Sequence, residues 1–199
     1  MKILVIFAHP KMSESIVQSQ MLGAIRNLEG VTIHDLYAAY PDFLIDVDHE
    51  QALLLAHDLV VLQHPFYWYS SPAIIKEWLD LVLEHNWAYG TQGTKLHGKF
   101  MMQAISTGGP EKSYEPQGKN RFEIRELLNP FNQTAYLCGM AYLEPFAIFV
   151  GRRIPRTDLN QQVEKYRDLI IALRDENILP LKTLAQNYSL PANFSLKKA

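Results

Sequence analysis

The sequence predicts an open α/β fold, in which helices cover both faces of a parallel β-sheet. Strand-like and helix-like patterns alternate along the chain, as they do where crossover helices join parallel strands. The run from Asp58 to Gln63 is continuously apolar, which is typical of a strand buried on both faces. The length of 199 residues suits one well-buried domain.

The first half of the chain supplies the first three strands. We expect strands over Lys2 to Ala8, Val31 to Tyr37 and Asp58 to Gln63, and helices over Ser15 to Leu28 and Asp48 to Ala56. The second strand alternates with period two, which suits a sheet edge. A third helix has Pro72 in its first turn and then places apolar side chains at helical spacing, at Ile75, Leu79, Val82 and Leu83.

The second half continues the same alternation. A strand over Lys99 to Ser106 is followed by a long connection, Thr107 to Asn120, and by a helix that ends near Cys138. Met140 to Val150 is predicted as the fifth strand, interrupted by Pro145. The last helix should run from Asp158, as N-cap, to Asn177. We place the domain at residues 1–178 and expect residues 179–199 to form a C-terminal arm or tail.

These elements make a flavodoxin-like three-layer sandwich with a five-stranded parallel sheet of order 2-1-3-4-5, a type that holds a flavin mononucleotide where the strand order reverses. The formal charge of −2 gives no drive toward nucleic acid or anionic membrane. The single cysteine, Cys138, excludes an internal disulfide and fits a reducing compartment. The apolar N-terminus is short and lacks a cleavage site, so we expect a cytoplasmic protein.

An aromatic loop, Pro65 to Ser71, follows the third strand. Ligands bind at the carboxyl ends of strands in open α/β sheets, and successive aromatics suit a large flat ligand. We interpret this ligand as a flavin, with Trp68 nearest its ring and the N–H groups of Phe66 to Tyr69 at its polar edge. The alternative is a hydrophobic cluster against the final helix or a partner subunit. We favour binding, because a simple core more often uses Leu and Val.

The loops after the first and fourth strands should reach the same crevice. Ser13 and Ser15 precede a helix whose N-terminus can bind an anion, although for the serines alone we favour the role of an N-cap. His9, at the tip of the first strand, could contact phosphate or ribityl. After the fourth strand, Gly108 and Gly109 allow the backbone to approach a ligand closely, or form a plain turn.

Tyr114 could place its hydroxyl over the ring and donate to a substrate carbonyl, or be an exposed loop residue. Other chemistries are disfavoured. No Gly-x-Gly-x-x-Gly follows the first strand, and no phosphate loop ending in Gly-Lys-Ser/Thr occurs. The seven histidines lack metal-ligand spacing, so we predict no metal site, and Cys138 has no evident base beside it.

The chain resembles the NAD(P)H:quinone oxidoreductase family from about Lys2 to Leu173, and within it the bacterial ancillary flavoproteins of glutathione-gated potassium efflux antiporters. The resemblance lies in ordered blocks: Ala8-His9-Pro10, Leu36-Tyr37, Tyr40-Pro-Asp-Phe43, Ile45-Asp46, Gln63-His-Pro65, Trp68-Tyr69-Ser70, Pro72, Lys76, Trp78, Asp80, Trp87-Ala-Tyr-Gly90, Leu96-His-Gly-Lys99 and Thr107-Gly-Gly109.

This resemblance implies a homodimer that binds FMN rather than FAD and passes hydride from NAD(P)H through flavin N5 to a quinone, in ping-pong order. It places the flavin contacts on His9, Ser15, Ile16, Val17, Gln18, Phe66, Tyr67, Trp68, Tyr69, Ser106, Thr107, Gly108 and Gly109. A tyrosine and a histidine lie over the ring in mammalian-type members. The matching residues here are Tyr114 and Asn120, so Tyr114 is the one catalytic side chain expected.

Two other functions stay open. The protein could be a regulatory subunit that docks on a membrane potassium/proton antiporter, at the inner face of the membrane, with its reductase activity incidental. An open flavin face could also permit the reduction of azo or nitro compounds, which is the weaker alternative.

Overall fold

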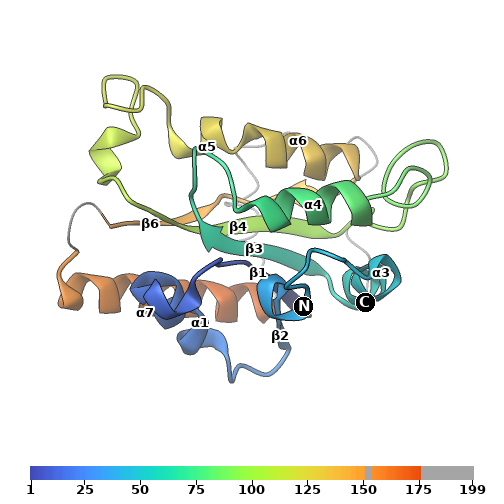
Figure 1. Cartoon of the computed structure of the whole chain (residues 1–199), viewed down its shortest axis with the longest axis horizontal. Helices are drawn as coiled ribbons and strands as arrows, with labels where there is room; N and C mark the ends of the chain where they lie inside the picture. Colours follow the sequence, from blue (N-terminus) through green and yellow to red (C-terminus); the bar gives the residue numbers. More distant parts are fainter. Residues whose placement is uncertain (151–153, 176–199) are drawn as a thin grey trace.

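In the computed structural model, which describes residues 1–150 and 154–175, a parallel β-sheet lies between two layers of helices (Figure 1). The strand order is β2-β1-β3-β4-β5, which confirms the predicted flavodoxin-like order. The strands are β1 (Ile3–Phe7), β2 (Val31–Asp35), β3 (Leu59–Pro65), β4 (Phe100–Thr107), β5 (Ala141–Tyr142) and β6 (Phe146–Phe149).

The predicted fifth strand is divided into two. β5 pairs with the start of β4, where Phe100 lies beside Ala141, and β6 pairs with its second half, where Ala104 lies beside Phe146. Pro145 falls between the two segments. Because proline has no N–H to donate, it interrupts a ladder of backbone hydrogen bonds.

Alternate residues of the central strands face opposite helical layers. Ile3 and Val5 of β1 pack with one cluster, while Leu4 and Ile6 pack with the other. Helices α1 (Ile16–Ile25) and α7 (Arg156–Arg174) cover the first side, and α3 (Val47–Ala56), α4 (Ala73–Val82) and α6 (Asn129–Leu137) cover the second (Figure 1). The central strands are therefore buried on both faces, as their apolar sequence predicts.

Several predicted boundaries are wrong for local reasons. The second strand ends at Asp35 rather than Tyr37, because the Asp35 carboxylate accepts hydrogen bonds from the N–H groups of Tyr37 and Ala38 and starts the short helix α2 (Leu36–Ala39). The first helix ends at Ile25, earlier than predicted. Pro72 lies just outside α4, at its N-cap position.

Two later helices also differ from the prediction. The helix expected before Cys138 consists of α5 (Ile124–Leu127) and α6, with Pro130 in the first turn of α6, where its missing N–H costs no hydrogen bond. Asp158 is not an N-cap: Pro155 holds that position, and Asp158 lies in the first turn of α7, where its charge favours the helix dipole. The predicted end of this helix at Asn177 and the predicted tail, 179–199, lie outside the described residues.

Among the helices in residues 1–150 and 154–175, none is both long enough and apolar enough to span a bilayer.

Candidate functional site

The loops after β1, β3 and β4 meet at the carboxyl edge of the sheet, as predicted. The N–H of Ala8 donates to the carbonyl of Gln63 at 3.0 Å, which joins the ends of β1 and β3. The first loop contacts the second through the rings of His9 and Tyr67, whose centroids lie 6.3 Å apart. The second contacts the third through Phe66 and Tyr114, at 6.1 Å.

A buried amide, Gln18, connects helix α1 to this edge. Its Nε2 donates to the carbonyl oxygen of His64 at 2.9 Å and to Ser106 Oγ at 3.0 Å. Its Oε1 accepts from Gln63 Nε2 at 3.1 Å, and Gln63 Oε1 accepts from the hydroxyl of Tyr166 in α7 at 2.9 Å. The Gln18 side chain is thus engaged within the protein, and its predicted contact with a cofactor stays a prediction.

The start of α1 has the features of an anion site. Ser15 is the N-cap, and its hydroxyl accepts from the N–H of Gln18 at 3.3 Å. The first N–H groups of a helix have no acceptor within it, so those of Ile16 and Val17 are directed outward. Ser13 lies in the preceding short helix, Met12–Glu14, and is exposed. The two serines therefore have different positions: Ser15 caps the helix, and Ser13 lies at the surface.

His9 is buried beside this helix start. Its Nδ1 accepts a hydrogen bond from the N–H of Lys11 at 3.1 Å, which leaves the proton on Nε2. Burial lowers the pKa of His9, with the hydrogen bond to Lys11 and the charge of Glu14 opposing the shift. A neutral imidazole with a fixed Nε2–H donor suits a phosphate or ribityl oxygen.

The aromatic loop presents fewer backbone donors than predicted. Phe66 N–H donates to the carbonyl of Ser106 at 2.8 Å, and Tyr67 N–H donates to that of Pro65 at 3.1 Å, so neither is free for a ligand. Trp68 and Tyr69, with φ of 50° and 62°, make no backbone hydrogen bond through their N–H groups within the described residues. The Trp68 side chain is 93% exposed. The polar edge of a ring can therefore meet two N–H groups here instead of four.

The loop after β4 holds a glycine that protein packing does not require. A Cβ added at Gly108 would meet no protein atom within 4 Å, and the residue does not have a positive φ. At Gly109 the same atom would lie 3.3 Å from the Tyr114 ring. Thr107 is buried, and its hydroxyl donates to the Gly109 carbonyl at 2.8 Å, which fixes the turn. The open space beside Gly108 leaves room for a ligand to approach the backbone closely, which stays a prediction.

Tyr114 lies half-buried beside these glycines. Its ring packs on Phe149, with centroids 5.6 Å apart, as well as on Phe66. Burial raises the pKa of Tyr114, with a hydrogen bond to Thr107 opposing the shift, so the hydroxyl keeps its proton at neutral pH. Asn120 lies across from the aromatic loop, where its Oδ1 accepts from the Tyr69 hydroxyl at 3.4 Å.

His64 was not predicted as a site residue, although two polar residues in a row in an apolar strand were a visible signal. It is fully buried, its Nδ1 lies 3.0 Å from the carbonyl oxygen of Pro65, and its Nε2 has no partner among the described residues. Burial lowers the pKa of His64 to about 4, opposed by the hydrogen bond to Pro65. The ring is therefore neutral at pH 7.

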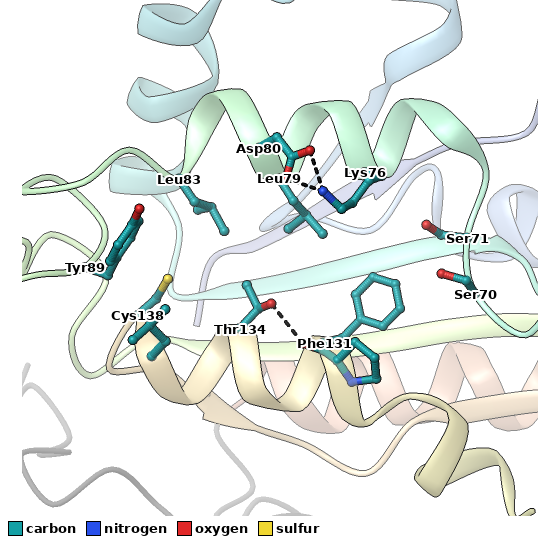
Figure 2. A pocket seen from close by; sticks show the side chains of 12 residues that line it. Ser70, Ser71, Lys76, Leu79, Asp80, Leu83, Tyr89, Phe131, Thr134 and Cys138 are labelled. Carbon is teal, nitrogen blue, oxygen red and sulfur yellow. Dashed lines mark hydrogen bonds and ion pairs between the residues drawn. The ribbon is translucent and has the colours of Figure 1, made fainter.

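An apolar groove borders the aromatic loop on the α4 side of the sheet. Figure 2 shows Leu79 of α4, Leu83 at its C-cap and Phe131 of α6 pointing into it, with Ser70 and Ser71 at one end. The cavity measures about 530 Å³, and an ion pair between Lys76 and Asp80 lies along its rim. Cys138 lines the far end, and burial raises the pKa of its thiol to about 11, so it stays protonated.

The comparisons with known proteins agree with this geometry. Residues 1–170 match the family described by a flavodoxin-like fold. A glutathione-regulated potassium-efflux system ancillary protein, KefG, of Pectobacterium carotovorum is 46% identical over 165 residues, which cover 83% of this chain and 90% of the relative. The predicted resemblance is thereby confirmed.

Two solved structures are similar over most of both chains. General stress protein 14 of Treponema denticola, in complex with FMN, has a TM-score of 0.79 and 38% identity, covering 88% of this chain and 98% of that one. An NADPH-quinone reductase from P. pentosaceus has a TM-score of 0.76 and 32% identity, covering 84% and 96%.

The buried His64 predicts a loss of stability in mild acid. An unfolded histidine has a pKa near 6.5 and the folded one about 4, so between these values the unfolded state binds a proton that the folded state does not. Stability attributable to His64 is complete above pH 6.5 and falls as the pH is lowered to 4. Since one pKa unit is worth about 1.4 kcal/mol, the total is about 3 kcal/mol. Urea unfolding at pH 7, 5.5 and 4 measures it.

The test variant is His64→Leu, and the control variant is His85→Gln, which removes a histidine that is exposed rather than buried. His64→Leu should lose less stability between pH 7 and 4 than the wild type, while His85→Gln should follow the wild type. Equal losses in His64→Leu and the wild type would contradict the assignment.

Proposed function

Because the chain belongs to the family defined by the flavodoxin-like fold, we propose that it is an FMN-dependent NAD(P)H:quinone oxidoreductase. One observation carries the proposal: a helix start suited to an anion, an exposed aromatic loop and a glycine without a packing role meet at one edge of the sheet. The similar proteins named for FMN binding and for NADPH-quinone reduction support the same activity.

The residues fit FMN in three parts. The start of α1 would hold the phosphate, through His9, Ser15, Ile16, Val17 and Gln18. The aromatic loop would hold the ring through Phe66, which is buried, and through Tyr67, Trp68 and Tyr69, which are exposed. The remaining polar edge would be held by Ser106, Thr107, Gly108 and Gly109. Bound FMN supplies two-electron hydride chemistry at N5.

The protein's own part in the reaction is orientation and proton placement. Trp68 and Tyr69 hold the ring by their side chains and by the two outward N–H groups. Tyr114 keeps its proton and donates a hydrogen bond to the quinone carbonyl, where negative charge develops during reduction. Nicotinamide and quinone use the same open side in turn, which gives a ping-pong order.

A second function rests on one observation, the 46% identity with a potassium-efflux ancillary protein. We propose that the protein also associates with a membrane antiporter of that type, from the cytoplasmic side, and that it does so as a homodimer. Exposed apolar side chains support an interface with a second copy: Tyr67, Trp68 and Tyr69 in the aromatic loop, and Phe122 and Leu137 outside it. Reduction of azo or nitro compounds has no specific support beyond an open ring face.

The cofactor assignment predicts a yellow protein. Its flavin absorption should bleach when NADPH or NADH is added without oxygen and recover when a quinone is added. Trp68→Ala should release FMN, seen as lost colour after gel filtration, because it removes an aromatic face worth about 1 kcal/mol or more. Leu44→Ala removes a similarly exposed apolar side chain elsewhere and should keep its colour. A colourless wild type that takes up no added FMN would end the proposal.

Tyr114→Phe separates catalysis from binding. The variant keeps the ring packing and loses only the hydroxyl, so FMN content should be unchanged while kcat/KM for the quinone falls about tenfold or more. Reduction of the flavin by nicotinamide should proceed at the normal rate in stopped flow. Unchanged quinone turnover would remove Tyr114 from the reaction.

The partner proposals have their own readouts. Light scattering after size exclusion should give twice the chain mass, and Trp68→Glu should lower it, since a charge would be buried at the interface. A monomeric wild type at micromolar concentration would contradict the dimer.

Co-purification with an antiporter encoded in the same genome tests the second function.

A further inference from the structure

A cluster of two imidazoles and a carboxylate lies at the β2 edge of the sheet, apart from the three loops of the flavin site. His34 belongs to β2, whereas His49 and Glu50 belong to the first turn of α3. One ligand atom from each residue lies within 4.8 Å of the other two. The crossover from β2 to α3 brings together histidines that are 15 positions apart, a pairing that sequence spacing does not reveal.

Glu50 is held in place as a carboxylate. It is fully buried, and its Oε1 accepts from the Tyr40 hydroxyl at 2.6 Å and from His34 Nε2 at 2.6 Å, while Oε2 accepts from Trp78 Nε1 at 2.7 Å. Burial alone would raise the pKa of Glu50, but the hydrogen bonds from His34, Tyr40 and Trp78 outweigh it and hold the pKa below its usual value. The carboxylate is thus charged, buried and fixed in orientation.

His49 is fixed through its backbone, and its side chain is exposed. The Asp46 carboxylate caps α3 by accepting from the N–H of His49 at 3.0 Å, which sets the first turn of the helix. The His49 side chain is exposed, and its ring centroid lies 5.8 Å from that of His34. Asp46 and Asp48 add negative charge to the same turn. A cation entering from solvent therefore meets His49 first.

We propose that His34, His49 and Glu50 form a binding site for a divalent transition metal of the zinc type. Two imidazoles and one carboxylate are ligands that such ions prefer, and three protein ligands leave one position for water. Ligand atoms about 2.1 Å from a metal lie about 3.4 Å apart in tetrahedral geometry, so His34 Nε2 and Glu50 Oε1 must separate by a fraction of an ångström from 2.6 Å.

The surrounding contacts fit this assignment. Tyr40 and Trp78 donate to Glu50 from the protein side, as groups behind a metal ligand commonly do. The metal takes the position of the hydrogen between His34 Nε2 and Glu50, and the metal-bound neutral imidazole carries its one proton on Nδ1. Bound metal joins β2 to α3.

The test is a zinc titration of the FMN-loaded protein without a histidine tag, after treatment with EDTA. Isothermal titration should give one Zn²⁺ per chain, and His49→Ala should weaken binding at least tenfold. His49 is exposed and makes none of the hydrogen bonds to Glu50, so this variant keeps the fold. His85→Ala removes another exposed histidine and should bind as the wild type does.

Thermal unfolding gives an independent readout. Zn²⁺ should raise Tm in the wild type and in His85→Ala, and at the same concentration raise it less in His49→Ala, because a ligand that binds only the folded state stabilises it in proportion to its binding free energy. The proposal is overturned by the absence of stoichiometric binding below millimolar Zn²⁺, or by equal affinity in His49→Ala and the wild type. Both readouts are independent of oxidoreductase turnover.

Discussion

One buried side chain, Gln18, connects helix α1 to the ends of β3 and β4, from which the aromatic loop and the glycine turn begin. A buried amide that lacks a partner costs about 1–3 kcal/mol, so each of its contacts stabilises this arrangement. Here they extend from α1 to the carbonyl of His64, to the hydroxyl of Ser106 and to the side chain of Gln63. The helix start, the aromatic loop and the glycine turn are thereby fixed relative to one another before any ligand arrives.

Buried polar side chains have different kinds of hydrogen-bond partner on the two sides of the sheet. On the α1 and α7 side, neutral groups satisfy each other in the chain from Gln18 through Gln63 to Tyr166. On the α3 and α4 side, a charged Glu50 is surrounded by donors. A neutral network responds little to pH or to ions, whereas a charged one at a sheet edge is responsive to both. The neutral network lies below the start of α1, whereas Phe66 and Tyr114 of the candidate site pack on the α3 and α4 side.

Sequence patterns predict the layers, the strand order and the three converging loops because each depends on local features: apolar runs, helical spacing and turn residues. The predictions are wrong where a particular hydrogen bond or packing contact determines the local structure. Asp35 ends the second strand because it caps α2, a short helix that the sequence did not predict. The N–H groups of Phe66 and Tyr67 are used by carbonyls of the neighbouring strand end and of the loop itself. His34 and His49 lie close together because of how α3 is placed beside β2, and their spacing in the sequence does not predict this proximity.

The aromatic loop has a further consequence for how this protein can change. Trp68 and Tyr69 occupy left-handed backbone conformations that cost residues with a side chain about 1–3 kcal/mol each. Glycine adopts this conformation without strain, so selection for fold stability alone would favour glycine at both positions. Retaining the aromatic pair therefore requires a contact that offsets this cost, with a ligand or with a second copy of the chain.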